Sequence, residues 1–273
     1  MNHDTDDHVY RYKYLPMDVG SVCAIADGTM KYTCPLEFND PFDCRPQVDV
    51  DTIMEAPKRR PDLWKAYLKS KGLSPAEGLQ YRRKILTQAR RSFDLDFFRR
   101  GLIESVGVCS LSRDPLNILM WSHYSSSHRG FLLEFCIPVS GPAYHADFAH
   151  EYLFPLEVHY REDRPVIAAF GDYTTEELQH HVLTKSKDWG YEQEERVIDH
   201  VRGPGIHTYQ RNRILRSVIC GSEMLNTDYE TIRTTVDTVN KTEGTDIGCY
   251  HVEQIDAKYA LTVPGHPRLD HRR

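Results

Sequence analysis

Short runs of alternating hydrophobic and polar residues recur along this chain, separated by segments with helical spacing. Residues 9–15 alternate strictly, so that three tyrosines occupy one face of a predicted strand and Arg11 and Lys13 occupy the other. Further strands are predicted at 29–34, 106–111, 131–137, 156–160, 194–200, 214–221, 249–254 and 259–263. Helices are predicted at 17–26, 114–124, 174–184 and 227–241. Because strands and helices interleave, the pattern predicts an α+β fold, mixed around one central sheet.

Residues 52–104 have a pattern of their own, which is helical. Ser74, Pro75 and Glu77 form a capping box with proline at the first helical position, so a helix begins there and is expected to run toward residue 104 with a break near Ser92. We interpret this segment as a helical insertion in a single domain of residues 9–263. The two tails, residues 1–8 and 264–273, are polar or rich in Pro and Gly and are predicted to be disordered.

The distribution of charge makes the insertion distinctive. Residues 58–100 contain 13 Lys and Arg against four Asp and Glu, although the whole chain has a formal net charge of -6. Charge segregated in this way creates a local positive field on an acidic protein. Two interpretations stay open. In the first, the insertion binds phosphates, nucleic acid or an acidic partner. In the second, its basic residues are only the solvated face of amphipathic helices. The basic face in either case consists of Arg82, Arg83, Arg90 and Arg91.

Composition narrows the class of protein. Forty per cent hydrophobic and 27% charged residues are typical of soluble globular proteins. No run of about 18 apolar residues is present, so we expect no membrane span. The acidic start of the chain does not resemble a secretory signal. Seven widely spaced cysteines without a CxxC pair indicate reduced thiols in a cytoplasmic protein, and we predict no metal site.

Three short islands combine large aromatic residues with polar groups. They are FNDPFD at 38–43, SLS at 110–112 followed by MWSHY at 120–124, and WGYEQEER at 189–196. This mixture suits a pocket that stacks against a flat ligand and holds it by polar contacts. Structural alternatives stay open for all of them: a tight turn, a strand end, core packing and a solvent-exposed face. Fingerprints of Rossmann, P-loop, zincin and α/β-hydrolase proteins are absent from the sequence.

The last island suggests acid chemistry. If residues 192–196 form a strand, its period of two places Glu192, Glu194 and Arg196 on one face. Two carboxylates on a shared face serve proton transfer or the stabilisation of a developing cation. Ser110 and Ser112 would likewise share a face, where hydroxyls can bind a ribose or orient a carboxylate.

Taken together, these islands resemble an uncharacterised bacterial domain family. Its members carry a tyrosine- or lysine-containing first strand, an FNDPFD loop, an MWxHYxxxHxG segment and a WxYExExR segment. Here the corresponding residues are Tyr12-Lys13-Tyr14, 38–43, 120–130 and 189–196, and the resemblance spans about residues 10–220. The family records no function, so this resemblance implies none.

The order of elements also resembles the ADP-ribosyltransferase fold, with a split central sheet. Glu192-Gln193-Glu194 resembles the ExE motif of one branch of these enzymes, and SLS its serine motif. The resemblance implies an enzyme that consumes NAD through an oxocarbenium-like state and transfers ADP-ribose to a macromolecule or to water. It implies that Glu194, Glu192 and Ser110 are catalytic. The residues it implies for NAD binding are Lys13, Arg11, Ser112, Trp121, Tyr124, Asn39 and His123.

Two other classes of function stay open. The chain could be a non-catalytic module that binds nucleic acid or a nucleotide through the basic insertion. It could instead be a metal-dependent nuclease with carboxylate ligands, namely Asp40, Asp43, Glu192 and Glu194. A role as a toxin or in phage defence would fit the transferase class, but no residue indicates it.

Overall fold

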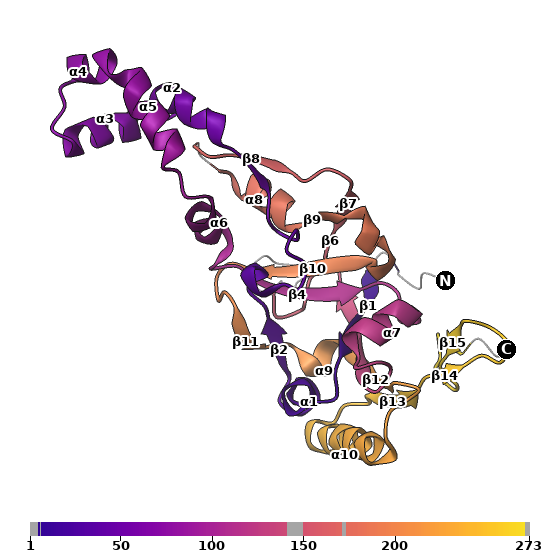
Figure 1. Cartoon of the computed structure of the whole chain (residues 1–273). Coiled ribbons are helices and arrows are strands. Elements are labelled where there is room, and N and C mark those ends of the chain that lie inside the picture. Colours follow the sequence, from indigo (N-terminus) through magenta and orange to yellow (C-terminus); the bar gives the residue numbers. More distant parts are fainter. Residues whose placement is uncertain (1–4, 6, 141–149, 171–172, 271–273) are drawn as a thin grey trace. The chain divides into compact units, whose positions relative to one another are not determined.

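The computed structural model describes residues 5, 7–140, 150–170 and 173–270 (Figure 1). The chain divides into two compact units. Unit 1 comprises Met1–Cys34, Val106–Val158 and Asp188–Arg273, and unit 2 comprises Pro35–Ser105 and His159–Lys187. The helical insertion predicted at 52–104 therefore belongs to unit 2, which also contains residues 159–187. Of the predicted disordered tails, residues 1–4, 6 and 271–273 lie outside the described residues.

A seven-stranded mixed sheet forms the centre of unit 1, in the order β13-β12-β5-β1-β4-β10-β6 (Figure 1). Its strands are β1 (His8–Leu15), β4 (Gly107–Ser112), β5 (Phe131–Pro138), β6 (Leu156–Glu157), β10 (Glu194–Asp199), β12 (Leu215–Cys220) and β13 (Gly248–His251). Neighbouring strands run antiparallel except β12 and β13, which are parallel. The prediction of a mixed α+β fold around one central sheet is confirmed.

Each face of this sheet is covered by its own hydrophobic core. We call one of them the tyrosine face, because Tyr12 and Tyr14 of β1 pack there with Leu132 and with α7 (Ile118–Tyr124). Leu133 and Phe135 belong to the larger core on the opposite face. Three helices contribute to that core: α1 (Val19–Ala26), α9 (Arg211–Ile214) and α10 (Asn226–Glu243). Two small antiparallel pairs complete unit 1, β2 (Thr29–Tyr32) with β11 (Gly205–Thr208) and β14 (Glu253–Gln254) with β15 (Leu261–Thr262).

Unit 2 is built from two short parallel strand pairs and a set of helices. The pairs are β3 (Gln47–Asp49) with β8 (Val166–Ala168) and β7 (His159–Arg161) with β9 (Thr184–Ser186). Its helices are α2 (Ala56–Arg59), α3 (Pro61–Ser70), α4 (Pro75–Gln80), α5 (Arg82–Arg91), α6 (Leu95–Ile103) and α8 (Thr175–Val182). The described residues also form the 3-10 turns η1 (Pro35–Glu37), η2 (Val50–Glu55) and η5 (Lys187–Glu192).

The capping box predicted in the insertion is present, but the helix that it begins is short. Ser74 accepts from the backbone N–H of Glu77, whose carboxylate accepts from the backbone N–H of Ser74. The helix expected from this start toward residue 104, with a break near Ser92, is three helices, α4, α5 and α6. The expected break is present, since α5 ends before Ser92, and a further break at Tyr81 separates α4 from α5. Asp94 begins α6, because its side chain accepts from the backbone N–H groups of Asp96 and Phe97.

The C-terminal segment 264–270, predicted to be disordered, packs on the tyrosine face. His266 and Leu269 are buried, and Val263 and Leu269 belong to the hydrophobic core there. His266 and Arg268 both contact the carboxylate of Glu134, which lies in the middle of β5. Composition alone could not predict this, because the partner that anchors the segment is far away in the sequence.

Candidate functional site

The helix α7 places the second island on the tyrosine face. Asn117 begins the helix by accepting from the backbone N–H groups of Leu119 and Met120, and its side-chain amide donates to the carbonyl of Tyr191. Trp121 is fully buried, donates its indole N–H to the carbonyl of Pro115 and meets Tyr14 edge-on. The Trp121 ring is therefore a core residue that offers no surface to a ligand in this structure.

The rest of the MWxHYxxxHxG segment forms the turn from α7 into β5. Ser126, Ser127 and His128 adopt positive φ, and the His128 ring stacks on Trp121 with 6.2 Å between ring centroids. Gly130 lies so close to β1 that an added Cβ would meet the carbonyl oxygen of Leu15 at 2.1 Å. Much of this motif therefore has a structural role, because its residues form a tight turn.

Tyr124 brings the helix into contact with the third island. Its hydroxyl donates to Oε1 of Glu192 at 2.5 Å, and the hydroxyl of Ser112 donates to the backbone carbonyl of Glu192 at 2.6 Å. Glu192 is only 2% exposed. The predicted strand over 194–200 is present as β10, which begins at Glu194, but Glu192 does not extend it, because Glu192 ends η5 and Gln193 has φ +44°. Turn geometry, and not strand alternation, therefore orients Glu192.

Glu194 and Arg196 do share the tyrosine face, and they form an ion pair. Arg196 donates from Nε and Nη2 to the two carboxylate oxygens of Glu194, at 2.8 and 3.0 Å. Both side chains are buried. Their direct cross-strand neighbours on β4 are Ser112 opposite Glu194 and Ser110 opposite Arg196. Of the predicted catalytic residues, Glu192 and Glu194 therefore lie beside Ser112, and we call these two acids the carboxylate cluster; Ser110 lies one residue pair further along, opposite Arg196.

Arg11 and Lys13 point to the opposite face of the sheet. Tyr12 pairs with Ser112, so its neighbours along β1 must face away from the serines. Arg11 forms an ion pair with Glu195, and Lys13 donates to the backbone carbonyl of Ser110 at 2.8 Å. These two predicted NAD-binding residues are therefore separated from the carboxylate cluster by the sheet itself.

Aromatic rings lie beside the carboxylate cluster. His123 is exposed, and its ring centroid is 6.4 Å from those of Tyr124 and Tyr191. Trp189 lies 6.1 Å from Tyr191. Tyr191 and Trp189 belong to the third island, but sequence reasoning did not single them out, because only the acids of that island matched a known motif.

Asn39, the remaining predicted NAD-binding residue, belongs to unit 2 and is exposed. The FNDPFD segment forms the tight turn that was one of its two interpretations. Oδ1 of Asp40 accepts from the backbone N–H of Phe42, and Asp43 donates its backbone N–H to the carbonyl of Asp40. The side chain of Asp43 is buried and forms an ion pair with Lys185, with 3.6 Å between Oδ2 and Nζ.

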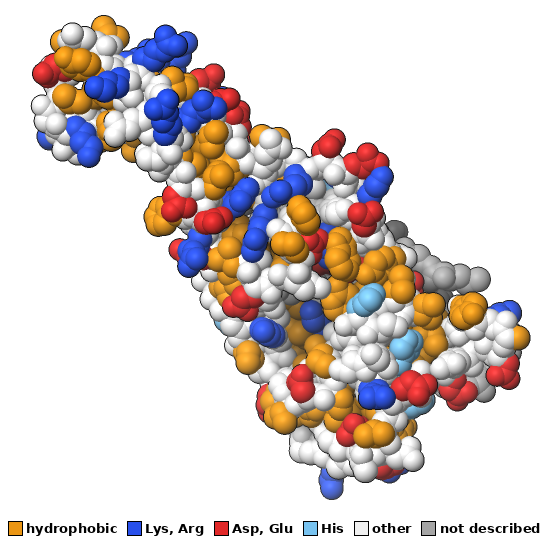
Figure 2. All heavy atoms as spheres, viewed as in Figure 1, with side chains coloured by type: hydrophobic (Ala, Val, Ile, Leu, Met, Phe, Trp, Pro, Cys, Tyr) orange, Lys and Arg blue, Asp and Glu red, His pale blue; other side chains and the backbone are white. Residues whose placement is uncertain are grey.

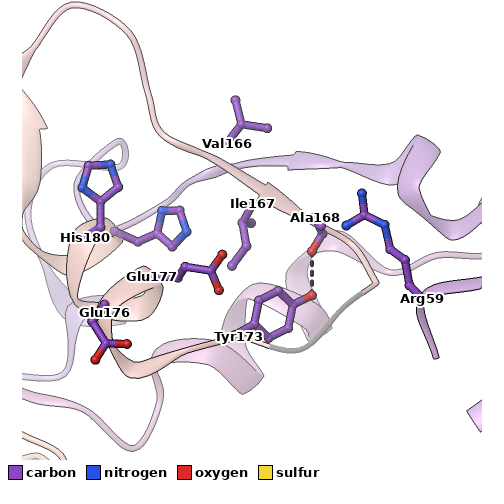
Figure 3. Close-up of a pocket in the computed structure, with 9 residues that line it drawn as sticks. Arg59, Val166, Ile167, Ala168, Tyr173, Glu176, Glu177 and His180 are labelled. Carbon is purple, nitrogen blue, oxygen red and sulfur yellow. Dashed lines mark hydrogen bonds between the residues drawn. The ribbon is translucent and has the colours of Figure 1, made fainter. Parts of the chain in front are cut away.

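Unit 2 contains a cavity of about 540 Å³ that sequence reasoning missed (Figure 3). It is lined by Arg59, β8, Tyr173 and four polar residues of α8, namely Glu176, Glu177, His180 and His181. The hydroxyl of Tyr173 donates to the carbonyl of Ala168 (Figure 3). Nδ1 of His181 is shielded from solvent without a hydrogen-bond partner, and burial together with His180 lowers the pKa of His181. No island falls on these residues, so nothing in the sequence pointed to them.

Comparison with protein families supports the first resemblance in coarse form. A family model described as "Protein of unknown function (DUF2971)" matches residues 120–197. That stretch begins in α7, includes β5 and ends in β10, and so contains both acids of the carboxylate cluster but not the serines of β4. The chain is thus similar, over this segment, to an uncharacterised domain family. No curated protein and no solved structure matches the chain.

Within the described ranges, no group of three or more His, Cys, Asp or Glu side chains is arranged to hold a metal ion. In the part of the chain that the structure describes, no helix is both long and apolar enough to cross a membrane.

Proposed function

We propose that this chain is an NAD-consuming enzyme of the ADP-ribosyltransferase type, which transfers ADP-ribose to a macromolecule or to water. The observation that carries the proposal is the pair of buried carboxylates at the start of β10. Glu192 is oriented by Tyr124 and Glu194 by Arg196, and the β4 serine side chains lie beside them. Burial and fixed hydrogen bonds are what an electrostatic catalyst needs, because they pre-orient charge without reorganisation during the reaction.

The proposed reaction breaks the bond between nicotinamide and ribose. The bonding electron pair leaves with nicotinamide, and the positive charge develops on the ribose C1′ and ring oxygen. Glu194, which is paired with Arg196, stabilises that charge and accepts a hydrogen bond from the ribose. The acceptor hydroxyl, or water, then forms the new bond to C1′ and gives its proton to Glu192. The rings of His123 and Tyr191 provide the stacking surface, and the pyrophosphate has no assigned partner because Arg11 and Lys13 face the other way.

The test is nicotinamide release from NAD by the purified chain, with and without RNA, DNA or cell lysate. We expect Glu194→Gln and Glu192→Gln each to lower the rate about 100-fold or more, as for the loss of a positioned acid or base. Glu157→Gln is the matched control, because this exposed carboxylate pairs with Arg113 outside the cluster. Melting curves check that all variants fold. Release that is absent under every condition, or unchanged in both cluster variants, would sink the proposal.

A second candidate function, nucleic-acid binding, is favoured by one further observation. The helix α5 carries five cationic side chains and no acidic one, and among the described residues only Arg90 of these five forms an ion pair, with Asp51. Figure 2 shows Lys and Arg side chains gathered over the segment that contains α3 to α5. A surface of this kind binds phosphate backbones by releasing counterions.

Salt dependence tests this candidate. Binding of a short RNA or DNA duplex should weaken linearly on a log–log plot as salt rises, with a slope of about -0.9 for each phosphate neutralised on duplex DNA. Replacing Arg83 and Arg91 with Gln should make that slope shallower by about two, whereas Glu194→Gln should leave it unchanged. Absence of binding at low salt would remove the candidate.

A further inference from the structure

Three arginines converge directly after the FNDPFD turn in unit 2. Arg99 of α6 donates to the carbonyl of Pro46 at 3.4 Å, and Arg164 donates from Nε to the carbonyl of Arg45 at 3.0 Å. Because Arg45 and Pro46 are consecutive, these two guanidinium groups are held as neighbours. The side chain of Arg45 starts from the same two-residue segment. We call Arg45, Arg99 and Arg164 the arginine cluster.

The cluster has few counter-charges in the protein. Among the described residues, Arg99 forms one ion pair, with Asp96. Nη1 of Arg99 lies 4.0 Å from Oδ1 of Asp96, and the Asp96 side chain is 95% exposed. Asp40 is the acid that favours the charged form of Arg164, while partial burial and the neighbouring Arg99 and Arg45 lower the pKa of Arg164. Three positive charges therefore face one nearby buried carboxylate.

Hydrogen-bonding capacity in the cluster is also unused. Within the described ranges, the guanidinium of Arg45 makes no ion pair or hydrogen bond, and Nε of Arg99 is shielded from solvent without a partner. Arg164 lies over the ring of Phe42, with 5.6 Å to its centroid, and Phe42 is 62% exposed. A multivalent oxyanion that binds between three such guanidinium groups would stabilise the folded protein, because it offsets their repulsion and accepts their unused hydrogen bonds.

We propose that the arginine cluster is a binding site for a phosphoryl oxyanion. Guanidinium groups form paired hydrogen bonds to phosphate oxygens, and three of them match the several oxygens of one phosphoryl group. The phosphoryl group can belong to a free nucleotide or to a polynucleotide, since both present the same oxygens. The proposal is independent of the proposed NAD activity, because it concerns residues of unit 2 only and its test requires no turnover.

Calorimetric titration of the full chain at constant ionic strength tests the site, with pyrophosphate, ADP and a short single-stranded RNA as separate ligands. We expect saturable binding of pyrophosphate, and about tenfold or greater loss of affinity in Arg45→Gln, the typical effect of removing a charge-assisted hydrogen bond. Arg45→Gln should fold normally, since its guanidinium holds nothing in place. Arg45→Lys keeps the charge but loses the planar fork, and we expect it to bind more weakly than the wild type.

Arg213→Gln is the matched control, because it removes the same charge from an exposed position of α9 in unit 1. Its affinity for pyrophosphate should equal that of the wild type. Tighter binding of ADP than of RNA would identify a nucleotide site, and the reverse a polynucleotide site, provided that Arg45→Gln weakens the tighter ligand. No binding of pyrophosphate to the wild type, or an equal loss in Arg45→Gln and Arg213→Gln, would overturn the proposal.

Discussion

The carboxylate of Glu134 offers a sharp test of how the C-terminal segment is held. It is 2% exposed in the middle of the sheet, and it accepts from the hydroxyl of Ser217 at 2.5 Å and contacts Nε2 of His266 at 2.6 Å. Arg268 forms the ion pair with its other oxygen and also lies over the ring of Tyr10. We predict that Arg268→Met strongly destabilises unit 1, because it leaves the buried carboxylate without its permanent cation.

The expected size follows from these contacts. Removing one partner of a buried ion pair typically lowers the free energy of unfolding by about 3–5 kcal/mol. We expect a loss at the lower end, about 3 kcal/mol, because two polar partners of Glu134 remain and the Arg268 side chain is 14% exposed. Such a loss lowers the melting temperature by roughly 6–12 °C for a unit of this size. Urea unfolding followed by circular dichroism measures the loss, and limited proteolysis shows whether residues 264–270 are released.

Two further variants separate this explanation from a general loss of charge. Arg233→Met removes an arginine from an exposed pair with Glu230 on α10 and should change stability by less than about 1 kcal/mol. Adding Glu134→Gln to Arg268→Met should restore more than half of the loss, because the uncompensated charge is gone. A loss below about 1 kcal/mol in Arg268→Met, or no recovery in the double variant, would refute the reasoning.

Two other predictions concern the turn into β5 and the cavity of unit 2. Gly130→Ala should destabilise the protein by at least about 2 kcal/mol, because the added Cβ would clash with the backbone of Leu15. Gly101→Ala in α6 is the control: the added Cβ meets open space there, so it should be neutral or slightly stabilising in the same urea titration. Burial together with His180 lowers the pKa of His181, so the stability that it contributes is complete above its ordinary pKa of about 6.5 and is lost as pH falls. The urea midpoint should therefore fall from pH 7 to pH 5, and less steeply in His181→Gln; equal slopes would contradict this.

Local patterns in the sequence predicted most of the elements of the fold. The alternation of residues 9–15 became β1, the capping box at Ser74 begins α4, and the apolar run at 131–137 became the central strand β5. These features depend on neighbours a few residues away, through side-chain period and capping, so they can be read without knowing the fold. The proximity of Glu192 and Glu194 was also anticipated, because only one residue separates them in the sequence.

Other features depend on residues far apart, and the sequence could not predict them. The positive φ of Gln193 takes Glu192 out of the strand, and the register of β1 against β4 places Arg11 on the sheet face of Glu195, away from the serines. Unit 2 acquires its cavity and its arginine cluster only when residues 159–187 fold against 35–105.

The sequence by itself therefore determined the fold class, the strands and helices, and the islands in which chemical side chains gather. Tertiary structure alone decided which charges meet, as for Arg268 and Glu134, and which motif residues are structural, as for Trp121. The physical reason is one of range. Hydrogen-bond patterns and side-chain periodicity act within a few residues, whereas ion pairing, burial and cavities depend on strand order and on packing between distant segments.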